Sequence, residues 1–558
     1  MRGNYTCFST TMDCVRSRFS SGVRPKPLGS PMSLVNNERQ EGGEGRLGGI
    51  KRFWSLQTAL FLGLWFWLLI AGEKKLFRDP GIFWHLRVGE QILTTGQFPH
   101  TDTFSFTAAG KPWIARQWLG ECAMALLHRM SGFDGLLLGT VTLLAGFYTW
   151  LAHRFLRTGV PGWLAILLTV LAMKTSYYHL HPRPALLTNV LLGWTFARLC
   201  DFESGRIPFR SLFWLVPVSL VWTNTHDGVV GGMGTIGLAI AGWGFCKLLG
   251  WNGPLVNYRQ FILSGILIIC CGLTALVNPY GLEVPRTWFT LLSSPVLPQL
   301  ITEHFPLIRS PVGWKALPFG LLYLAALVGV LPRRPRLTWL IPLVWLYLAW
   351  TRIRHGPLFV TVASIALADM LPHVRWAAWL SRWGSDLFRI QDSVCVEGRR
   401  ILSWKPAILP LALVLMAVAL QTAAVPLPVL GRGWAKIDPQ LWPVDLLPEL
   451  RAYERSHPAG TPIYNHMNFG GFLIYYTPGL RVFIDDRCEL YGDEQLLAHD
   501  CAETADPGKI DCWARQYGFD AALAITGSPL DWYLRQTPDW KMVRQTRTAT
   551  FYERSTSE

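Results

Sequence analysis

The sequence is dominated by long apolar blocks, and these limit what the chain can fold into. Most of the blocks are about 17 to 22 residues long, and they carry almost no charge. At a rise of 1.5 Å per residue, a helix of that length crosses roughly 30 Å of hydrocarbon. Only 16% of the 558 residues are charged, against about a quarter in soluble domains. The chain is therefore predicted to be an α-helical polytopic membrane protein.

Eleven blocks are long enough to be read as transmembrane helices. They are 54–72, 134–152, 161–178, 185–200, 211–225, 229–249, 260–277, 315–331, 337–351, 356–371 and 405–424. The short loop with Arg333, Arg334 and Arg336 predicts which side is cytoplasmic, because Lys and Arg gather in inner loops. The N-terminus is then inside, the C-terminus is outside, and the protein is expected in a plasma or inner membrane.

This topology divides the chain into three parts. Residues 1–53 are rich in Ser, Arg and Gly and are predicted to be a disordered, basic cytoplasmic tail. Residues 54–424 form the transmembrane domain, in which 73–132 is the first outer loop. Residues 425–558 form a soluble outer domain. The net charge of +15 is spread over short loops without a basic stripe, which argues against a nucleic-acid partner.

The first outer loop is the richest polar segment. Residues 82–95 have apolar side chains at helical spacing and predict a helix in the membrane interface, which Gly96 would end. Residues 113–130 predict a second amphipathic helix, and the stretch between them is rich in turn-forming residues.

Three carboxylates of this loop are candidate catalytic groups. Asp79 directly follows the first span, Asp102 lies in the turn-rich stretch, and Glu121 lies in the second helix. A carboxylate here can act as a general base or bind a metal ion. The alternative for Asp79 is structural, since it can satisfy free backbone N–H groups at the start of the next helix.

The other outer connections are also unusually polar. Among the histidines, only His153 and His373 are predicted to lie inside. Polar side chains at the ends of spans are costly and usually line a wet cavity. The cavity residues predicted from these connections are Arg183, Asn224, His226, Asp227, Asn278, Glu303, His304, Arg352, Arg354 and His355.

The C-terminal 134 residues follow a different pattern, typical of a small α/β domain. Buried strands are predicted at 472–476, 482–484 and 521–525, and helices near 493–501 and 508–517. Asp485, Asp486 and Arg487 end a predicted strand, where a salt bridge is favoured over a ligand site. A disulfide among Cys488, Cys501 and Cys512 is left open.

Together these features resemble the GT-C superfamily of membrane glycosyltransferases, which includes the dolichyl-phosphate-mannose protein mannosyltransferases and the aminoarabinose transferases. The match in topology covers most of 54–424. Specific motifs similar to those of bacterial GT-C-like proteins are Asp79-Pro80, Trp84-His85-Leu86, Trp118-Leu119-Gly120-Glu121, Asn224-Thr225-His226-Asp227-Gly228, Asn278-Pro279-Tyr280-Gly281 and Phe483-Ile484-Asp485-Asp486-Arg487.

The resemblance implies a polyprenyl-phosphate sugar as donor and places Asp79 at the position of the catalytic acid of the first loop. Many relatives have a second acid beside the first, whereas Pro80 and Gly81 follow here. A partner carboxylate is therefore expected from Asp102, Glu121 or Asp227. The resemblance does not identify the acceptor, which can be a lipid, a glycan or a protein.

The expected chemistry fits these residue types. A hydroxyl or amine acceptor is a poor nucleophile until a base takes its proton, and Asp79, His85, Asp102 and Glu121 are the predicted catalytic residues. Donor phosphate would be bound by Arg183, His226, Arg352, Arg354 and His355, because cationic groups match phosphate oxygens. A divalent cation such as Mg²⁺ or Mn²⁺, held by Asp79, could share this role.

A transporter or flippase of lipid-linked glycans is the alternative function. Such proteins usually show internal repeats and broken or charged spans at the membrane midplane. The sequence shows no repeat, and its ionisable residues gather at one face. These features favour the transferase.

Overall fold

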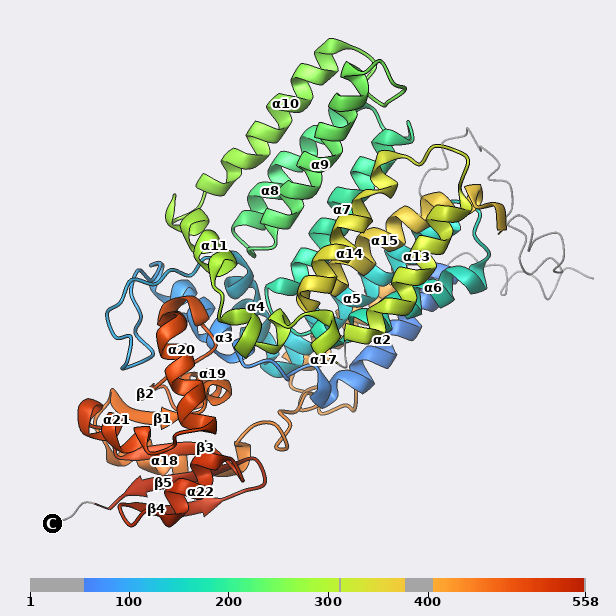
Figure 1. Cartoon of the computed structure of the whole chain (residues 1–558). Helices are drawn as coiled ribbons and strands as arrows, with labels where there is room; N and C mark the ends of the chain where they lie inside the picture. Colours follow the sequence, from blue (N-terminus) through green and yellow to red (C-terminus); the bar gives the residue numbers. More distant parts are fainter. Residues whose placement is uncertain (1–54, 311–312, 377–404, 556–558) are drawn as a thin grey trace, which may run out of the picture. The chain divides into compact units, whose positions relative to one another are not determined.

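The computed structural model describes residues 55–310, 313–376 and 405–555 (Figure 1). The predicted tail at 1–53 lies outside the described residues. Helices lie in all eleven predicted apolar segments: α2 (Leu56–Lys75), α5 (Phe133–Leu156), α6 (Gly162–Ser176), α7 (Ala185–Glu203), α8 (Leu215–Thr223), α9 (Val229–Leu248), α10 (Tyr258–Leu273), α13 (Leu317–Gly329), α14 (Ile341–Thr351), α15 (Gly356–Met370) and α17 (Lys405–Thr422).

Five helical segments of the described chain are long and apolar enough to cross a membrane by length and composition. They are 56–75, 133–156, 229–248, 258–276 and 353–373. The helical membrane architecture agrees with the sequence, whereas the number of eleven spans, the orientation and the domain boundaries remain predictions.

Helix α15 is the most enclosed of these helices, with almost every residue buried. It packs against α5, α6, α7, α13 and α14. Since a helix that is apolar on all sides buries well in a bundle, its uniform sequence suits this central place.

The first loop contains the two expected helices. α3 (Gly81–Thr95) ends at Gly96, whose φ of 67° is the left-handed conformation that glycine adopts readily, so this prediction is confirmed. α4 (Trp118–Ser131) begins five residues later than predicted, because 113–117 forms turns and extended chain. The helices pack closely at Gly89, where an added Cβ would lie 2.1 Å from the Glu121 carbonyl oxygen.

The C-terminal part has the expected α/β character. Its strands are β1 (Thr461–Asn465), β2 (Leu480–Val482), β3 (Ala521–Ile525), β4 (Trp540–Gln545) and β5 (Ala549–Arg554), in the order β2-β1-β3-β5-β4. β1 is parallel to β2 and β3, and β5 is antiparallel to β3 and β4. The helices are α18 (Leu447–Ser456), α19 (Met467–Tyr476), α20 (Cys488–Thr504), α21 (Lys509–Tyr517) and α22 (Pro529–Gln536).

One predicted strand of this domain is wrong. Residues 472–476 belong to helix α19, because a short apolar run fits a buried helix as well as a strand. Gly471 lets α19 lie against the start of α3: an added Cβ would be 2.3 Å from the Pro80 carbonyl oxygen. The cysteines Cys488, Cys501 and Cys512 are free.

Candidate active site

Asp79 lies between α2 and α3 and makes the structural contact that the sequence left open as one of its two alternatives. Its Oδ1 accepts a hydrogen bond of 2.9 Å from the Gly81 N–H at the start of α3. Its Oδ2 forms an ion pair with Arg183, which precedes α7. Asp79 is 7% exposed, so the ion pair is largely shielded from water.

Arg183 also joins Asp79 to a second acid. Its Nη1 lies 3.1 Å from Glu303 Oε1, in η4 (Thr302–His304), and this oxygen is 3.4 Å from His179 Nδ1, in η1 (Tyr177–His179). Although burial alone would raise the pKa of Glu303, Arg183 and His179 hold that pKa well below its usual value. The carboxylate of Glu303 is therefore ionised and shares Arg183 with Asp79.

A cavity of about 260 Å³ has His179 in its lining. Six of the predicted cavity residues line it: His226, Asp227, His304, Arg352, Arg354 and His355. Apolar side chains line it too, among them Leu291, Leu348 and Leu358. The structure thus brings together residues of several predicted outer loops, far apart in the sequence, in a space that is both cationic and apolar.

Two arginines crowd one histidine in this cavity. Arg354 Nη1 lies 2.7 Å from His304 Nε2, and Arg352 Nη1 lies 3.3 Å from His304 Nδ1. A neutral imidazole has one acceptor nitrogen, so it cannot satisfy both donors. Burial and the two arginines lower the pKa of His304 to about 3. Within the described residues, neither arginine has a carboxylate within ion-pair distance, which leaves uncompensated positive charge in the cavity.

The loop before α9 supplies the other polar wall. Asp227 accepts hydrogen bonds from Arg116 Nε (2.6 Å) and Trp288 Nε1 (2.9 Å). His226 Nδ1 is an acceptor for the Gly228 N–H at 2.9 Å, and burial lowers the pKa of this imidazole to about 3. His226 is therefore neutral at physiological pH and keeps Nε2–H as a donor.

His85 and Glu121 form a buried pair between α3 and α4. His85 Nδ1 lies 2.9 Å from Glu121 Oε1, and the two side chains are 2% and 1% exposed. Burial lowers the pKa of His85 well below its usual value and raises the pKa of Glu121 to about 8. Glu121 Oε2 has no hydrogen-bond partner, so the pair is not fully satisfied by its surroundings.

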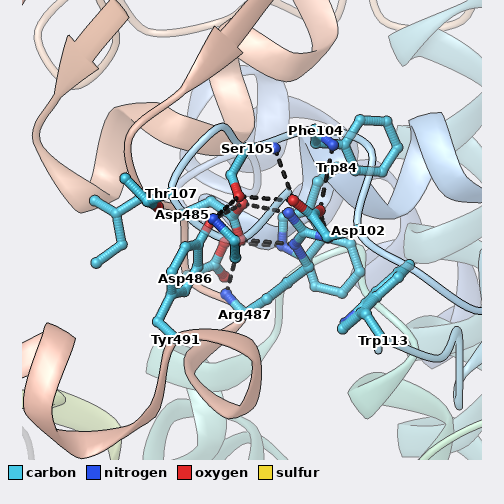
Figure 2. Close-up of polar contacts among 12 residues, drawn as sticks. Trp84, Asp102, Phe104, Ser105, Thr107, Trp113, Asp485, Asp486, Arg487 and Tyr491 are labelled. Atoms are coloured by element: carbon cyan, nitrogen blue, oxygen red, sulfur yellow. Dashed lines mark hydrogen bonds and ion pairs between the residues drawn. The ribbon is translucent and has the colours of Figure 1, made fainter. Parts of the chain in front are cut away.

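A carboxylate that the sequence did not place at the site borders the same small space as Asp79. A Cβ added to Gly81 would be 2.9 Å from Asp79 Oδ1 and 3.1 Å from Asp486 Oδ2, so both carboxylates border one small space. Trp84 donates a hydrogen bond of 2.8 Å to Asp486 Oδ1 (Figure 2). Burial, Asp79 and Asp485 raise the pKa of Asp486 to about 8. The predicted sources of a second acid, Asp102, Glu121 and Asp227, all have other partners.

Asp102 belongs to a separate, closed cluster. Its Oδ1 lies 2.8 Å from Arg487 Nη1, and its Oδ2 accepts from the backbone N–H (2.9 Å) and the hydroxyl (2.6 Å) of Ser105. Arg487 also donates to Asp485 at 2.8 and 2.7 Å. Figure 2 shows these side chains of the first loop and the C-terminal domain facing one another. The salt bridge predicted for this strand end is present.

Backbone pairing continues this junction. Phe106 N–H donates to the Val482 carbonyl oxygen and Val482 N–H donates to the Phe104 carbonyl oxygen, both at 3.1 Å. The segment 104–106 therefore lies beside β2 as a parallel bridge. The first loop therefore pairs with the edge strand β2 of the C-terminal sheet, and this pairing holds Asp486 close to Asp79.

Asn224 and Asn278 take part in the framework of the loops. Asn224 donates to the Leu220 and Val277 carbonyl oxygens at 2.9 Å each and accepts from Trp118 at 2.8 Å. Asn278 donates to the carbonyl oxygens of Ala275 (2.8 Å) and Gly281 (3.1 Å) within its own turn. Their amide groups are occupied by these contacts.

A metal ion at Asp79 does not fit the arrangement well. Both Asp79 oxygens already accept from Gly81 or Arg183. Among the described residues, no group of three or more His, Cys, Asp and Glu side chains is placed to hold a metal ion. The predicted divalent cation therefore stays a prediction, and no step below depends on it.

The fold is similar to that of the solved oligosaccharyltransferase AglB, which agrees with the helical membrane architecture that the sequence resemblance implied. The oligosaccharyltransferase AglB from Archaeoglobus fulgidus, in complex with an inhibitory peptide and a dolichol-phosphate, aligns with a TM-score of 0.53 at 11% identity, over 91% of this chain and 75% of AglB. ArnT from Cupriavidus metallidurans aligns with a TM-score of 0.48 in the apo state and 0.40 bound to undecaprenyl phosphate, at 14% identity, over 91% of this chain and 98% of ArnT.

No protein-family profile and no curated protein matches the sequence significantly.

Proposed function

We propose that this protein is a membrane glycosyltransferase that moves a sugar from a polyprenyl-phosphate donor to an acceptor at the face predicted to be outside. The observation that carries the proposal is the cavity in which Arg352 and Arg354 form no ion pair with a carboxylate of the described residues. A phosphate would supply the missing negative charge, and the leucines would contact the first part of the lipid chain. The dolichol-phosphate bound by AglB, which has the same fold, supports this donor class.

Asp79, Arg183, Glu303 and His179 form a cluster, here called the Asp79 cluster, that adjoins this cavity and is the proposed reaction centre. His179 lines the cavity and contacts Glu303, and Glu303 shares Arg183 with Asp79. Asp79 would serve as the base that takes the proton of the acceptor. Arg183 would stabilise charge that develops on the departing phosphate, as preorganised cations do.

A transporter or flippase remains the alternative, since a lipid phosphate site suits either function. The juxtaposition of carboxylates with the cation cluster favours transfer, because translocation needs no base. Movement of lipid-linked glycan across vesicles that contain the wild type, with no sugar transfer, would favour the alternative.

The test is transfer of labelled hexose from undecaprenyl-phosphate hexoses and dolichyl-phosphate hexoses in purified membranes. We expect Asp79→Asn to lower transfer at least 100-fold, which is the lower range for loss of a general base. Full transfer by this variant would show that Asp79 is not the base.

A second measurement isolates the donor site. Binding of undecaprenyl phosphate to the purified protein should weaken more than tenfold in the Arg352→Gln, Arg354→Gln double variant, since each hydrogen bond to a charged group contributes about 1.5–3 kcal/mol. The matched control is Arg334→Gln with Arg336→Gln, two arginines outside the cavity. Equal binding by both double variants would rule out this cavity as the phosphate site.

A further inference from the structure

Asp486 occupies a place that a structural salt bridge does not explain. The neighbouring Asp485 is fully buried and accepts two hydrogen bonds from Arg487. Asp486 is only partly buried, contacts no cation at ion-pair distance among the described residues, and receives one hydrogen bond, from Trp84. Its other oxygen faces the space that Asp79 borders at Gly81.

Two carboxylates around one small space do not ionise equally. Arg183 contacts Asp79 directly and therefore stabilises charge on that member. Asp486 has no such contact and is the member on which a proton is held more tightly.

We propose that Asp486 of the C-terminal domain and Asp79 of the first loop form one acid–base pair, in which Asp486 receives the proton that the acceptor loses. This inference rests on the proposed transferase function and assigns a catalytic residue to the C-terminal domain.

The reactive form is the pair with both carboxylates ionised. The acceptor O–H or N–H bond breaks, and its proton passes to Asp79 and from there to Asp486, where it stays. The bond between the acceptor and the sugar C1 forms as the bond from C1 to the phosphate oxygen breaks, and that electron pair goes to the phosphate. Arg352 and Arg354 can balance the added negative charge. The partly exposed Asp486 then releases the proton to water, which restores the pair.

The geometry gives Trp84 a role in positioning this proton. Its indole N–H donates to Asp486 Oδ1 at 2.8 Å, which leaves Oδ2 as the oxygen directed at the shared space. An asparagine at 486 can keep the hydrogen bond from Trp84, so Asp486→Asn removes the proton acceptor with little change in shape. Asp500→Asn is the matched control, because Asp500 is an exposed acid of the same domain.

The test is the pH dependence of sugar transfer from undecaprenyl-phosphate and dolichyl-phosphate hexoses. In the wild type and Asp500→Asn, the rate should rise with pH and level off near pH 8, where Asp486 loses its proton. Asp486→Asn should transfer at least 100-fold more slowly and lose this rise, while it binds undecaprenyl phosphate within threefold of wild type. Asp486→Glu should recover part of the rate. Wild-type transfer by Asp486→Asn would overturn the proposal and leave the transferase function intact.

A spectroscopic measurement tests the pair of Asp79 and Asp486 independently of the transferase function. The infrared difference spectrum of wild type minus Asp486→Asn should contain a protonated-carboxyl band that disappears as the pH rises through about 8. If the wild type transfers no hexose, the transferase function fails, and this band alone tests the acid–base pair. Its presence supports a proton on Asp486, and its absence overturns the pair.

Discussion

Two clusters of ionised side chains connect with the first loop, and they differ in how completely their charges are satisfied. In the Asp102 cluster, Asp102, Asp485 and Arg487 are at most 2% exposed, and both carboxylates have several donors. In the Asp79 cluster, Arg183 is 18% exposed and pairs with two carboxylates at once. This cluster adjoins a cavity that has surplus positive charge.

The difference separates a structural junction from a reactive site. A buried ion pair is costly to break, because one unpaired charge remains without water. A cluster that is open to a cavity can exchange its partners for a ligand, which a site that binds and releases substrate requires. The same residue types thus predict stability at Asp102 and activity at Asp79, and the variants below test that division.

The largest effect is expected from Arg487→Ala, which leaves Asp102 and Asp485 buried without their cation. The loss should be about 3–5 kcal/mol, the range for removing one partner of a buried pair. Hydrogen–deuterium exchange at the Phe106 and Val482 amides, which pair the loop with β2, should lose protection by this amount. Unchanged protection would mean that the closed cluster does not hold the junction.

Arg183→Gln should lower activity and leave the junction intact, the opposite of what is expected for Arg487→Ala. Transfer should fall about 100- to 1,000-fold, as for loss of a preorganised donor that stabilises developing charge. Exchange at the Phe106 and Val482 amides should remain as in the wild type, because Arg183 has no contact with that junction. A general loss of protection would contradict the proposed division.

Gly81→Ala tests the space between the two carboxylates. The new methyl group would be 2.9 Å from Asp79 Oδ1 and 3.1 Å from Asp486 Oδ2, so it must displace at least one of them. We expect transfer to fall about tenfold or more, since small displacements of reacting groups are costly. The control is Gly63→Ala in α2, where an added Cβ meets no atom within 4 Å. Equal activity of both variants would argue against a shared space.

The stability of the protein should also depend on the proton of Asp486. The pKa is raised from 3.8 to about 8, so the folded state holds this proton where the unfolded state has lost it. Folding then binds more protons between about pH 4 and 8, and stability must fall as the pH rises through that window. The free energy of unfolding of wild type and Asp486→Asn should differ in this slope by up to about 1.4 kcal/mol per pH unit, the value for one proton bound on folding. Parallel curves would contradict the shift.

The smallest effect is expected from Arg129→Ala. Arg129 pairs with Glu90 at 2.9 Å across α4 and α3, but the two side chains are 41% and 42% exposed. Solvent screens such a pair, so its loss should leave the free energy of unfolding nearly unchanged. Transfer should be unaffected. A larger change would show that exposure does not indicate how much an ion pair of this loop contributes to stability.

Local patterns predicted much of the fold. The helical spacing of apolar residues in 82–95 and the following Gly96 specify α3 and its end, because both depend on neighbouring residues. Residues 472–476 could not be assigned in this way, since five consecutive apolar residues carry neither a helical nor a strand period. The helix packs at Gly471 against Pro80, a residue far away in the sequence, and a local pattern does not contain this contact.

The candidate site was predictable only where its residues share one face. The outer-loop position of His226, His304 and Arg354 was sufficient to expect a common cavity. The partner of Asp79 was not predictable, because Asp486 lies some 400 positions away and follows a strand end where a salt bridge is the commoner explanation. Its neighbour Asp485 has that salt bridge, and only the fold distinguishes the two acids.

The pairing of 104–106 with β2 also affects when the protein becomes competent during its synthesis. The loop segment is translated early, whereas β2, Asp486 and Arg487 are translated almost 400 residues later. At about 5–20 residues per second, the loop waits on the order of 20–80 s for its partner strand. The membrane helices can insert in that interval, but the carboxylate pair forms only after the C-terminal domain has been made, so an incomplete chain lacks the second acid.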